Sequence, residues 1–229
     1  MPVNRAQLAK MIDYAALHAN TTEKDVQRLC EEAKKYHVAS VCVNPAFSGM
    51  AAALLKGSDV KVGSVVDFPL GQSTVRAKSF EALDCIGRGA QELDMVMNVG
   101  ALKSGHLELA RRGIEAVVKL TRAKEPEIGQ TITIKVIIET CYLTDKEKKV
   151  ASEIVRDAGA DFVKTSTGFG SGGATVKDVK LIRETVGFNV GVKASGGIKK
   201  CAQALELIEA GATRIGTAAA VPILEECAE

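Results

Sequence analysis

Two lysines stand near the ends of short apolar runs that otherwise resemble buried strands. Lys164 follows Asp161-Phe-Val, and Lys193 follows Val190-Gly-Val, 29 residues further along the chain. A single lysine at a strand end ordinarily extends its ammonium group to water. Two ammonium groups buried side by side are costly, and both burial and the like charge lower a lysine pKa from its reference value of ~10.4. A lysine that is neutral near pH 7 is a nucleophile that forms Schiff bases with carbonyl compounds.

The chemistry expected of such a lysine is cleavage of a carbon–carbon bond. A protonated imine is an electron sink, so a neighbouring bond can break and leave an enamine. Asp94 lies in the middle of Glu92-Leu-Asp-Met-Val96, two predicted strands before Lys164, and is a candidate for moving protons. No cluster with metal-ligand spacing accompanies these residues, because the histidines are isolated: His18, His37 and His106. We therefore expect a class I aldolase that uses no metal and no cofactor.

Glycines follow the last predicted strands. Gly196 and Gly197 come after the seventh strand, and Gly216 lies near the end of the eighth. In barrels built from strand–helix units, these loops commonly bind phosphate through backbone N–H groups. The glycines predict a phosphate subsite, and the alternative is that they only form tight turns.

A further glycine cluster leaves a second function open. Gly168-Phe-Gly-Ser-Gly-Gly173 matches G-x-G-x-x-G between a strand and a helix, as in dinucleotide-binding oxidoreductases. That motif is accompanied by an acidic residue at the end of the next strand, where this chain has Lys193-Ala194. The oxidoreductase hypothesis is therefore the weaker one.

The elements that position these residues alternate along the whole chain. Eight β-branched runs predict strands over Ile12–Leu17, Ala39–Val43, Lys61–Asp67, Leu93–Asn98, Thr133–Glu139, Asp161–Thr165, Asn189–Ala194 and Arg214–Thr217. Most are continuously apolar, as parallel strands covered on both faces are. Eight strand–helix units in 229 residues favour an α/β fold, a single (β/α)8 TIM barrel formed by one domain over residues 1–229. An open doubly wound sheet is the alternative.

Helix boundaries between the strands have recognisable signals. Thr22 precedes an amphipathic stretch, and Asn44-Pro45 offers a cap followed by proline at the first helical position. Thr144 and Glu147 have capping-box spacing. Gly-Ala pairs beginning at Gly89, Gly159 and Gly211 are expected to end helices in a left-handed conformation.

Composition limits the classes of partner. Lys and Arg total 30 against 28 Asp and Glu, aromatic residues are 4%, and Trp is absent, which argues against nucleic acid. No apolar stretch reaches the roughly 18 residues of a membrane span. The six cysteines are scattered, so we expect reduced thiols and a cytoplasmic protein. Barrels of this kind often bury apolar helix faces in homo-oligomers, so a dimer or tetramer is expected.

Six segments, in the same order, resemble the deoxyribose-phosphate aldolase family. They are Cys42-Val-Asn-Pro45, Phe68-Pro-Leu-Gly71, Glu92-Leu-Asp-Met-Val-Met-Asn-Val-Gly-Ala-Leu-Lys-Ser-Gly105, Lys135-Val-Ile-Ile-Glu-Thr140, Phe162-Val-Lys-Thr-Ser-Thr-Gly-Phe169 and Gly191-Val-Lys-Ala-Ser-Gly-Gly-Ile198. The resemblance implies a TIM barrel that reversibly cleaves 2-deoxy-D-ribose 5-phosphate to D-glyceraldehyde 3-phosphate and acetaldehyde. Its substrates would be small phosphorylated sugars and aldehydes.

The resemblance also implies roles for individual residues. Lys164 matches the Schiff-base lysine, and Lys193 matches a second lysine that keeps Lys164 unprotonated and joins a proton relay. Asp94 matches the catalytic aspartate, which moves protons through a water molecule. Backbone contacts to phosphate match four glycines: Gly168, Gly196, Gly197 and Gly216.

Several positions depart from the family pattern. The loop after the eighth strand often contains serine, whereas this chain reads Gly216-Thr-Ala-Ala219, so phosphate binding would rely on backbone amides and the Thr217 hydroxyl. Position 169, a lysine in some members, is Phe169, and the first strand reads Asp13-Tyr-Ala. These differences concern phosphate affinity more than chemistry. Lys135 is either a neighbour in the proton relay or an ion-pair partner of Glu139. Two alternatives stay open: another lysine-dependent barrel aldolase and an inactive phosphate-binding barrel.

Overall fold

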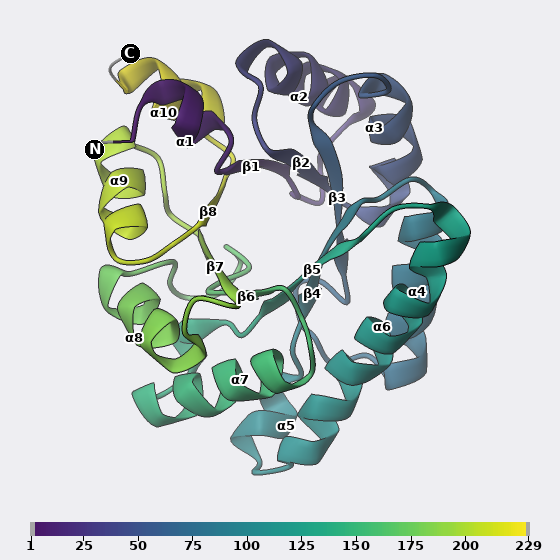
Figure 1. Cartoon of the computed structure of the whole chain (residues 1–229), viewed down its shortest axis with the longest axis vertical. Helices are drawn as coiled ribbons and strands as arrows, with labels where there is room; N and C mark the ends of the chain where they lie inside the picture. The colour runs from purple at the N-terminus through teal and green to yellow at the C-terminus, as the bar shows by residue number, and fades with distance from the viewer. Residues whose placement is uncertain (1–2, 228–229) are drawn as a thin grey trace.

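The strands close into a ring in chain order. The computed structural model describes residues 3–227, and its strands pair in parallel from β1 to β8, with β8 returning to β1 (Figure 1). The strand bounds are β1 Ile12–Ala16, β2 Ser40–Val43, β3 Lys61–Val66, β4 Glu92–Val96, β5 Thr133–Ile137, β6 Phe162–Lys164, β7 Gly191–Ser195 and β8 Arg214–Thr217. The predicted barrel is confirmed, and the open sheet is excluded by the pairing of β8 with β1.

Helices surround this ring, as Figure 1 shows. The α-helices are α1 Arg5–Ala9, α2 Glu23–Tyr36, α3 Ser48–Leu54, α4 Val75–Gly87, α5 Val99–Lys103, α6 Leu107–Ile128, α7 Asp145–Asp157, α8 Val176–Val186, α9 Cys201–Glu209 and α10 Ala220–Glu226, and the 3₁₀ turns are η1 Pro45–Phe47 and η2 Thr140–Tyr142. Thr22 caps α2, and Thr144 with Glu147 forms the predicted capping box of α7. Asn44 precedes η1 without a side-chain cap, since its amide donates to Leu17 O instead.

The glycines that were expected to end helices do so. Gly89, Gly159 and Gly211 all have positive φ, of 98°, 80° and 114°. This left-handed conformation costs glycine little, and it turns the chain directly into the next strand.

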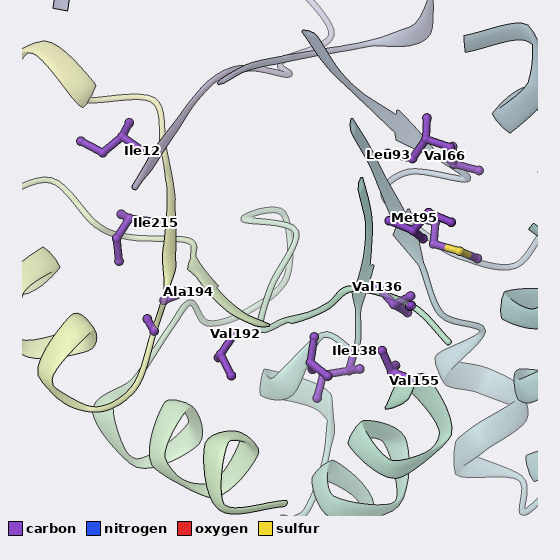
Figure 2. Packing of buried hydrophobic residues seen from close by; sticks show 14 of the residues in the cluster. Ile12, Val66, Leu93, Met95, Val136, Ile138, Val155, Val192, Ala194 and Ile215 are labelled. Carbon is purple, nitrogen blue, oxygen red and sulfur yellow. The ribbon is translucent and has the colours of Figure 1, made fainter. Parts of the chain in front are cut away.

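Side chains alternate between the two faces of the strands. Leu93 and Met95 point outward around Asp94, and Val192 and Ala194 point outward around Lys193, into the apolar layer beneath the helices (Figure 2). Successive strand residues face opposite sides, so Asp94 and Lys193 point into the barrel. The apolar core thus lies outside the ring of strands, and charged side chains occupy the interior of the ring.

The expectation that all six cysteines are free thiols is wrong, because Cys201 of α9 and Cys227 after α10 form a disulfide. Folding brings these residues together from positions 26 apart. None of the helices within residues 3–227 combines the length and the hydropathy that a membrane span requires.

Candidate active site

The three predicted catalytic residues meet inside the carboxyl-terminal end of the barrel. Lys164 and Lys193 are register partners on β6 and β7, and both are almost fully buried. Asp94 of β4 bridges them: its Oδ2 accepts from Lys164 Nζ at 2.6 Å and from Lys193 Nζ at 2.7 Å. One carboxylate oxygen therefore holds two amino groups that would otherwise repel one another.

Lys135 lies beneath this trio and belongs to the same network. Its Nζ donates to Glu92 Oε2 at 2.6 Å and to Asp94 Oδ1 at 2.9 Å, and lies 3.4 Å from Asp13 Oδ2. It is an ion-pair partner, but of these carboxylates and not of Glu139, so that part of the sequence interpretation is wrong. The physical reason is that Glu139, just before η2, has a positive φ of 52°, and its carboxylate instead accepts from Thr167 N–H at 3.2 Å.

Asp13 and Arg214 complete the network and were not singled out from the sequence. Asp13 Oδ2 lies 2.5 Å from Lys193 Nζ, and its Oδ1 accepts from Arg214 at 2.6 Å and from Ser40 Oγ at 2.7 Å. Arg214 also donates to Glu92 at 3.0 Å. The sequence does contain a signal for this network, because several of the buried strands include a charged residue. A buried charge requires a partner of opposite charge, here from another strand of the barrel.

The charges in the barrel move the lysine pKa values in opposite directions. Burial lowers the pKa of Lys164; Asp94 opposes this shift, and the positive charge of Lys193 adds to it. Burial alone would also lower the pKa of Lys193, but Asp13 and Asp94 raise it above its ordinary value. Lys193 therefore stays an ammonium ion, and Lys164 is the group that is more easily neutral.

The charges of the buried network also indicate that Lys164 is the lysine that is more easily neutral. Three carboxylates (Asp13, Glu92 and Asp94) face Lys135, Lys193 and Arg214, which together balance them. Lys164 is the fourth basic group of this network, so the network is electrically neutral when Lys164 is the free amine. Cys42 Sγ lies 4.0 Å from Asp94 Oδ2, and burial with the nearby carboxylate raises its pKa to about 11, so it remains a thiol at neutral pH.

Three of the four predicted phosphate-binding glycines cluster above these lysines. Gly168, Gly196 and Gly197 have positive φ values of 87°, 89° and 77°. A Cβ on Gly196 would lie 3.6 Å from Gly168 Cα, so the loops after β6 and β7 are in contact. Within residues 3–227, no backbone carbonyl accepts from the N–H of any of these three glycines. These donors are available to an anion.

The eighth strand contributes differently. Gly216 lies within β8, and a Cβ there would be 2.9 Å from Lys193 Cε, so glycine leaves space for the lysine side chain. The Thr217 hydroxyl donates to Ile198 O at 2.7 Å and accepts from Ala219 N–H. The Thr217 hydroxyl therefore links the loops after β7 and β8, and its proton is not available to the phosphate that it was expected to bind.

The glycine cluster after β6 has a packing explanation. A Cβ on Gly173 would lie 2.2 Å from Gly196 O, and one on Gly170 would lie 2.8 Å from Cys141 Sγ. Close approach of neighbouring loops therefore requires these glycines, without any dinucleotide.

Comparison with known proteins identifies the group to which this site belongs. Residues 7–220 match the DeoC/LacD family of aldolases. The chain belongs to the DeoC/LacD aldolase family. Curated relatives named deoxyribose-phosphate aldolase include those of Thermoanaerobacter pseudethanolicus, 55% identical with 96% of each chain covered, and Carboxydothermus hydrogenoformans, 52% identical with 97% of this chain and 96% of the relative covered.

Solved structures of the DeoC/LacD family have the same fold. A tetrameric deoxyribose phosphate aldolase from Aeropyrum pernix superposes with a TM-score of 0.89 at 34% identity, covering 97% of this chain and 91% of that one. The buried lysines described above thus lie in an aldolase barrel, and the oxidoreductase and inactive-barrel hypotheses lose their support.

Proposed function

We propose that the chain is a class I aldolase that reversibly cleaves 2-deoxy-D-ribose 5-phosphate to D-glyceraldehyde 3-phosphate and acetaldehyde. The observation that carries this proposal is the pairing of Lys164, whose pKa is lowered, with Lys193, whose pKa is raised, on one carboxylate. The name and high identity of the relatives support the choice of substrate.

In this mechanism Lys164 is the nucleophile. Its Nζ lone pair attacks the aldehyde carbon of the open-chain sugar, and loss of water from the carbinolamine gives a protonated imine. Removal of the proton from the C3 hydroxyl then breaks the C2–C3 bond. Its electron pair forms the enamine double bond and the aldehyde product leaves. Protonation of the enamine and hydrolysis release acetaldehyde and restore Lys164.

Asp94 and Lys193 are suited to move the protons that these steps require. Asp94 Oδ2 is within hydrogen-bond distance of both Nζ atoms, so a proton can pass between them through this oxygen or a water molecule beside it. Lys193 also supplies a fixed positive charge that disfavours the ammonium form of Lys164.

The phosphate end of the substrate would bind to backbone N–H groups. Gly168, Gly196 and Gly197 provide them. A phosphate contact of Gly216 stays a prediction from the sequence, since in the structure this glycine leaves space for the Lys193 side chain. A cytoplasmic location, one domain over the whole chain and assembly into a dimer or tetramer belong to the same proposal; the tetrameric Aeropyrum relative supports the last.

Trapping with borohydride tests the proposed chemistry. Incubation with acetaldehyde and sodium borohydride should give one reduced ethyl adduct, located on Lys164 by peptide mass spectrometry and absent from Lys164→Ala. An adduct on Lys193 would exchange the roles of the two lysines. No adduct on the folded protein would refute the aldolase mechanism.

A further inference from the structure

The Phe169 side chain lies across the open end of the barrel. It follows β6, and its ring centroid is 5.6 Å from that of His18, after β1, and 5.3 Å from that of Phe68, after β3, which it meets edge-on. Both contacted loops are at the carboxyl-terminal end, where Lys164 and Lys193 lie.

The order of the strands places this ring above the barrel axis. In the closed ring, β1 and β3 are each three positions from β6, on opposite sides of it. A side chain that touches loops so far around an eight-stranded ring has to cross the opening between them. Phe169 is 46% exposed, so its side chain is in contact with both solvent and the rest of the molecule.

A chain of hydrogen bonds fixes the backbone that carries Phe169. Its N–H donates to Thr167 Oγ1 at 3.0 Å, and Thr167 donates through both its N–H and its hydroxyl to the buried carboxylate of Glu139. Gly170, directly after Phe169, packs against Cys141 so closely that no side chain fits there. The backbone at Phe169 is therefore held by hydrogen bonds and packing within the loop itself.

A cavity lies beside Phe169, among the loops after β3, β4, β5 and β6. This cavity of about 380 Å³ is lined by Phe169, Leu70 and Tyr142 at its rim and by Val96 and Glu139 further in. Val96 is two residues after Asp94 on β4, so both face the inside of the barrel, with Val96 one layer nearer the opening. The apolar rim lies next to the layer that contains the reacting groups.

We propose that Phe169, held between His18 and Phe68, is the cover of the reaction chamber and restricts access of bulk water to the enamine formed on Lys164. This inference rests on the proposed function. The cover would favour addition of the enamine to an acceptor aldehyde over its protonation by solvent, because excluding bulk water leaves only the protons that Asp94 and Lys193 deliver.

Deuterium exchange measures this competition directly. The imine of acetaldehyde and Lys164 loses a methyl proton, the C–H electrons form the enamine double bond, and the C=N electrons return to nitrogen. Return of a deuteron from D₂O to the enamine carbon, followed by hydrolysis, releases deuterated acetaldehyde. The ratio of this exchange, followed by NMR, to addition onto glyceraldehyde 3-phosphate does not depend on the fraction of folded protein.

We expect the exchange-to-addition ratio of Phe169→Ala to exceed that of the unmodified chain by about fivefold or more. Phe169→Leu, which keeps an apolar side chain over the opening, should stay near the unmodified ratio. Phe188→Ala is the matched control, because Phe188 is 93% exposed and lies before β7, at the other end of the barrel. Its ratio should not change.

The outcomes separate the two proposals. If the unmodified chain shows neither exchange nor a borohydride adduct, the proposed function fails. If it shows both and folded Phe169→Ala keeps the original ratio, the cover is refuted while the aldolase chemistry stands. Should Phe169→Ala not fold, Phe68→Ala carries the test, because it removes one edge of the cover and is expected to raise the ratio by a smaller factor.

Discussion

Lys135 and Lys164 are buried lysines on neighbouring strands, yet their surroundings act on them in opposite ways. The register pairs Lys164 with Ile137, two residues beyond Lys135, so Lys164 lies one inward layer nearer the opening. Lys135 has three carboxylates within 3.4 Å, and Lys164 has one, which it shares with Lys193. Burial lowers the pKa of both groups, but Asp13, Asp94 and Glu92 raise that of Lys135 well above its ordinary value, whereas that of Lys164 remains lowered.

The difference shows that burial alone does not make a lysine reactive. In the lower layer, carboxylates surround Lys135 and stabilise its ammonium form. In the upper layer, Lys164 shares its one carboxylate with Lys193, so its ammonium form is less stabilised. Groups with shifted pKa values often mark functional sites, and here the direction of the shift separates the structural lysine from the reactive one.

Replacing Lys164 should produce the largest effect. Lys164→Met removes the nucleophile, so kcat for cleavage of deoxyribose 5-phosphate should fall at least about 10⁴-fold. The same change should raise the free energy of unfolding by about 1 kcal/mol, since a buried amine whose ammonium form is disfavoured is exchanged for an apolar side chain of similar length. Urea unfolding at pH 7 measures this free energy. A loss of stability would contradict the conclusion that the surroundings of Lys164, unlike those of Lys135, disfavour the ammonium form.

Replacing Lys135 should act mainly on stability. Lys135→Met leaves Glu92, Asp94 and Asp13 without their shared cation, which should lower the free energy of unfolding by roughly 3–5 kcal/mol. Lys119→Met on the exposed face of α6 is the matched control and should change it by no more than about 0.5 kcal/mol. Equal effects of the two substitutions in urea unfolding would show that Lys135 is not a structural ion-pair centre.

The faces of the strands could be predicted from the sequence because they depend on local alternation. Lys164, Lys193 and Asp94 were found from unexpected charges within apolar runs, and the structure brings them together. Five strands (β1, β3, β4, β5 and β6) end one or two residues earlier than predicted. After β3 and β5, Asp67 and Glu139 adopt positive φ values of 52°, which the β-branched pattern before them does not reveal.

The partners of those charges could not be predicted, because they depend on closure of the ring. Arg214 of β8 reaches Glu92 of β4, on the opposite side of the barrel and 122 residues away in the chain. Spacing indicates which side of a strand a residue faces, but the choice among several inward carboxylates follows from strand tilt and side-chain length. The Cys201–Cys227 disulfide was missed for a similar reason, since it depends on how α9 and α10 pack.

Removing Lys193 should raise the pKa of Lys164 and so bring it closer to that of Lys135. In Lys193→Met, Lys164 loses the neighbouring positive charge that lowers its pKa and keeps Asp94, which raises it. The pKa of Lys164 should therefore rise. Imine formation requires the free amine, so activity rises with pH through this pKa. The acidic limb of the kcat/KM profile, and of borohydride trapping, should therefore move to higher pH by about one unit. A shift to lower pH would exclude charge repulsion as the role of Lys193.

The smallest expected effect comes from a neutral hydrogen bond in the lower layer. Ser40 is fully buried, and its hydroxyl donates to Asp13 Oδ1 at 2.7 Å, an oxygen that also accepts from Arg214. Ser40→Ala should lower the free energy of unfolding by about 1 kcal/mol, the usual contribution of one such bond. The acidic limb of the kcat/KM profile should stay in place, because the charges around Asp13 and Lys193 are unchanged. If that limb moved as far as in Lys193→Met, the neutral hydrogen bond would be as important as the ion pairs, and charge balance would not explain the difference between the layers.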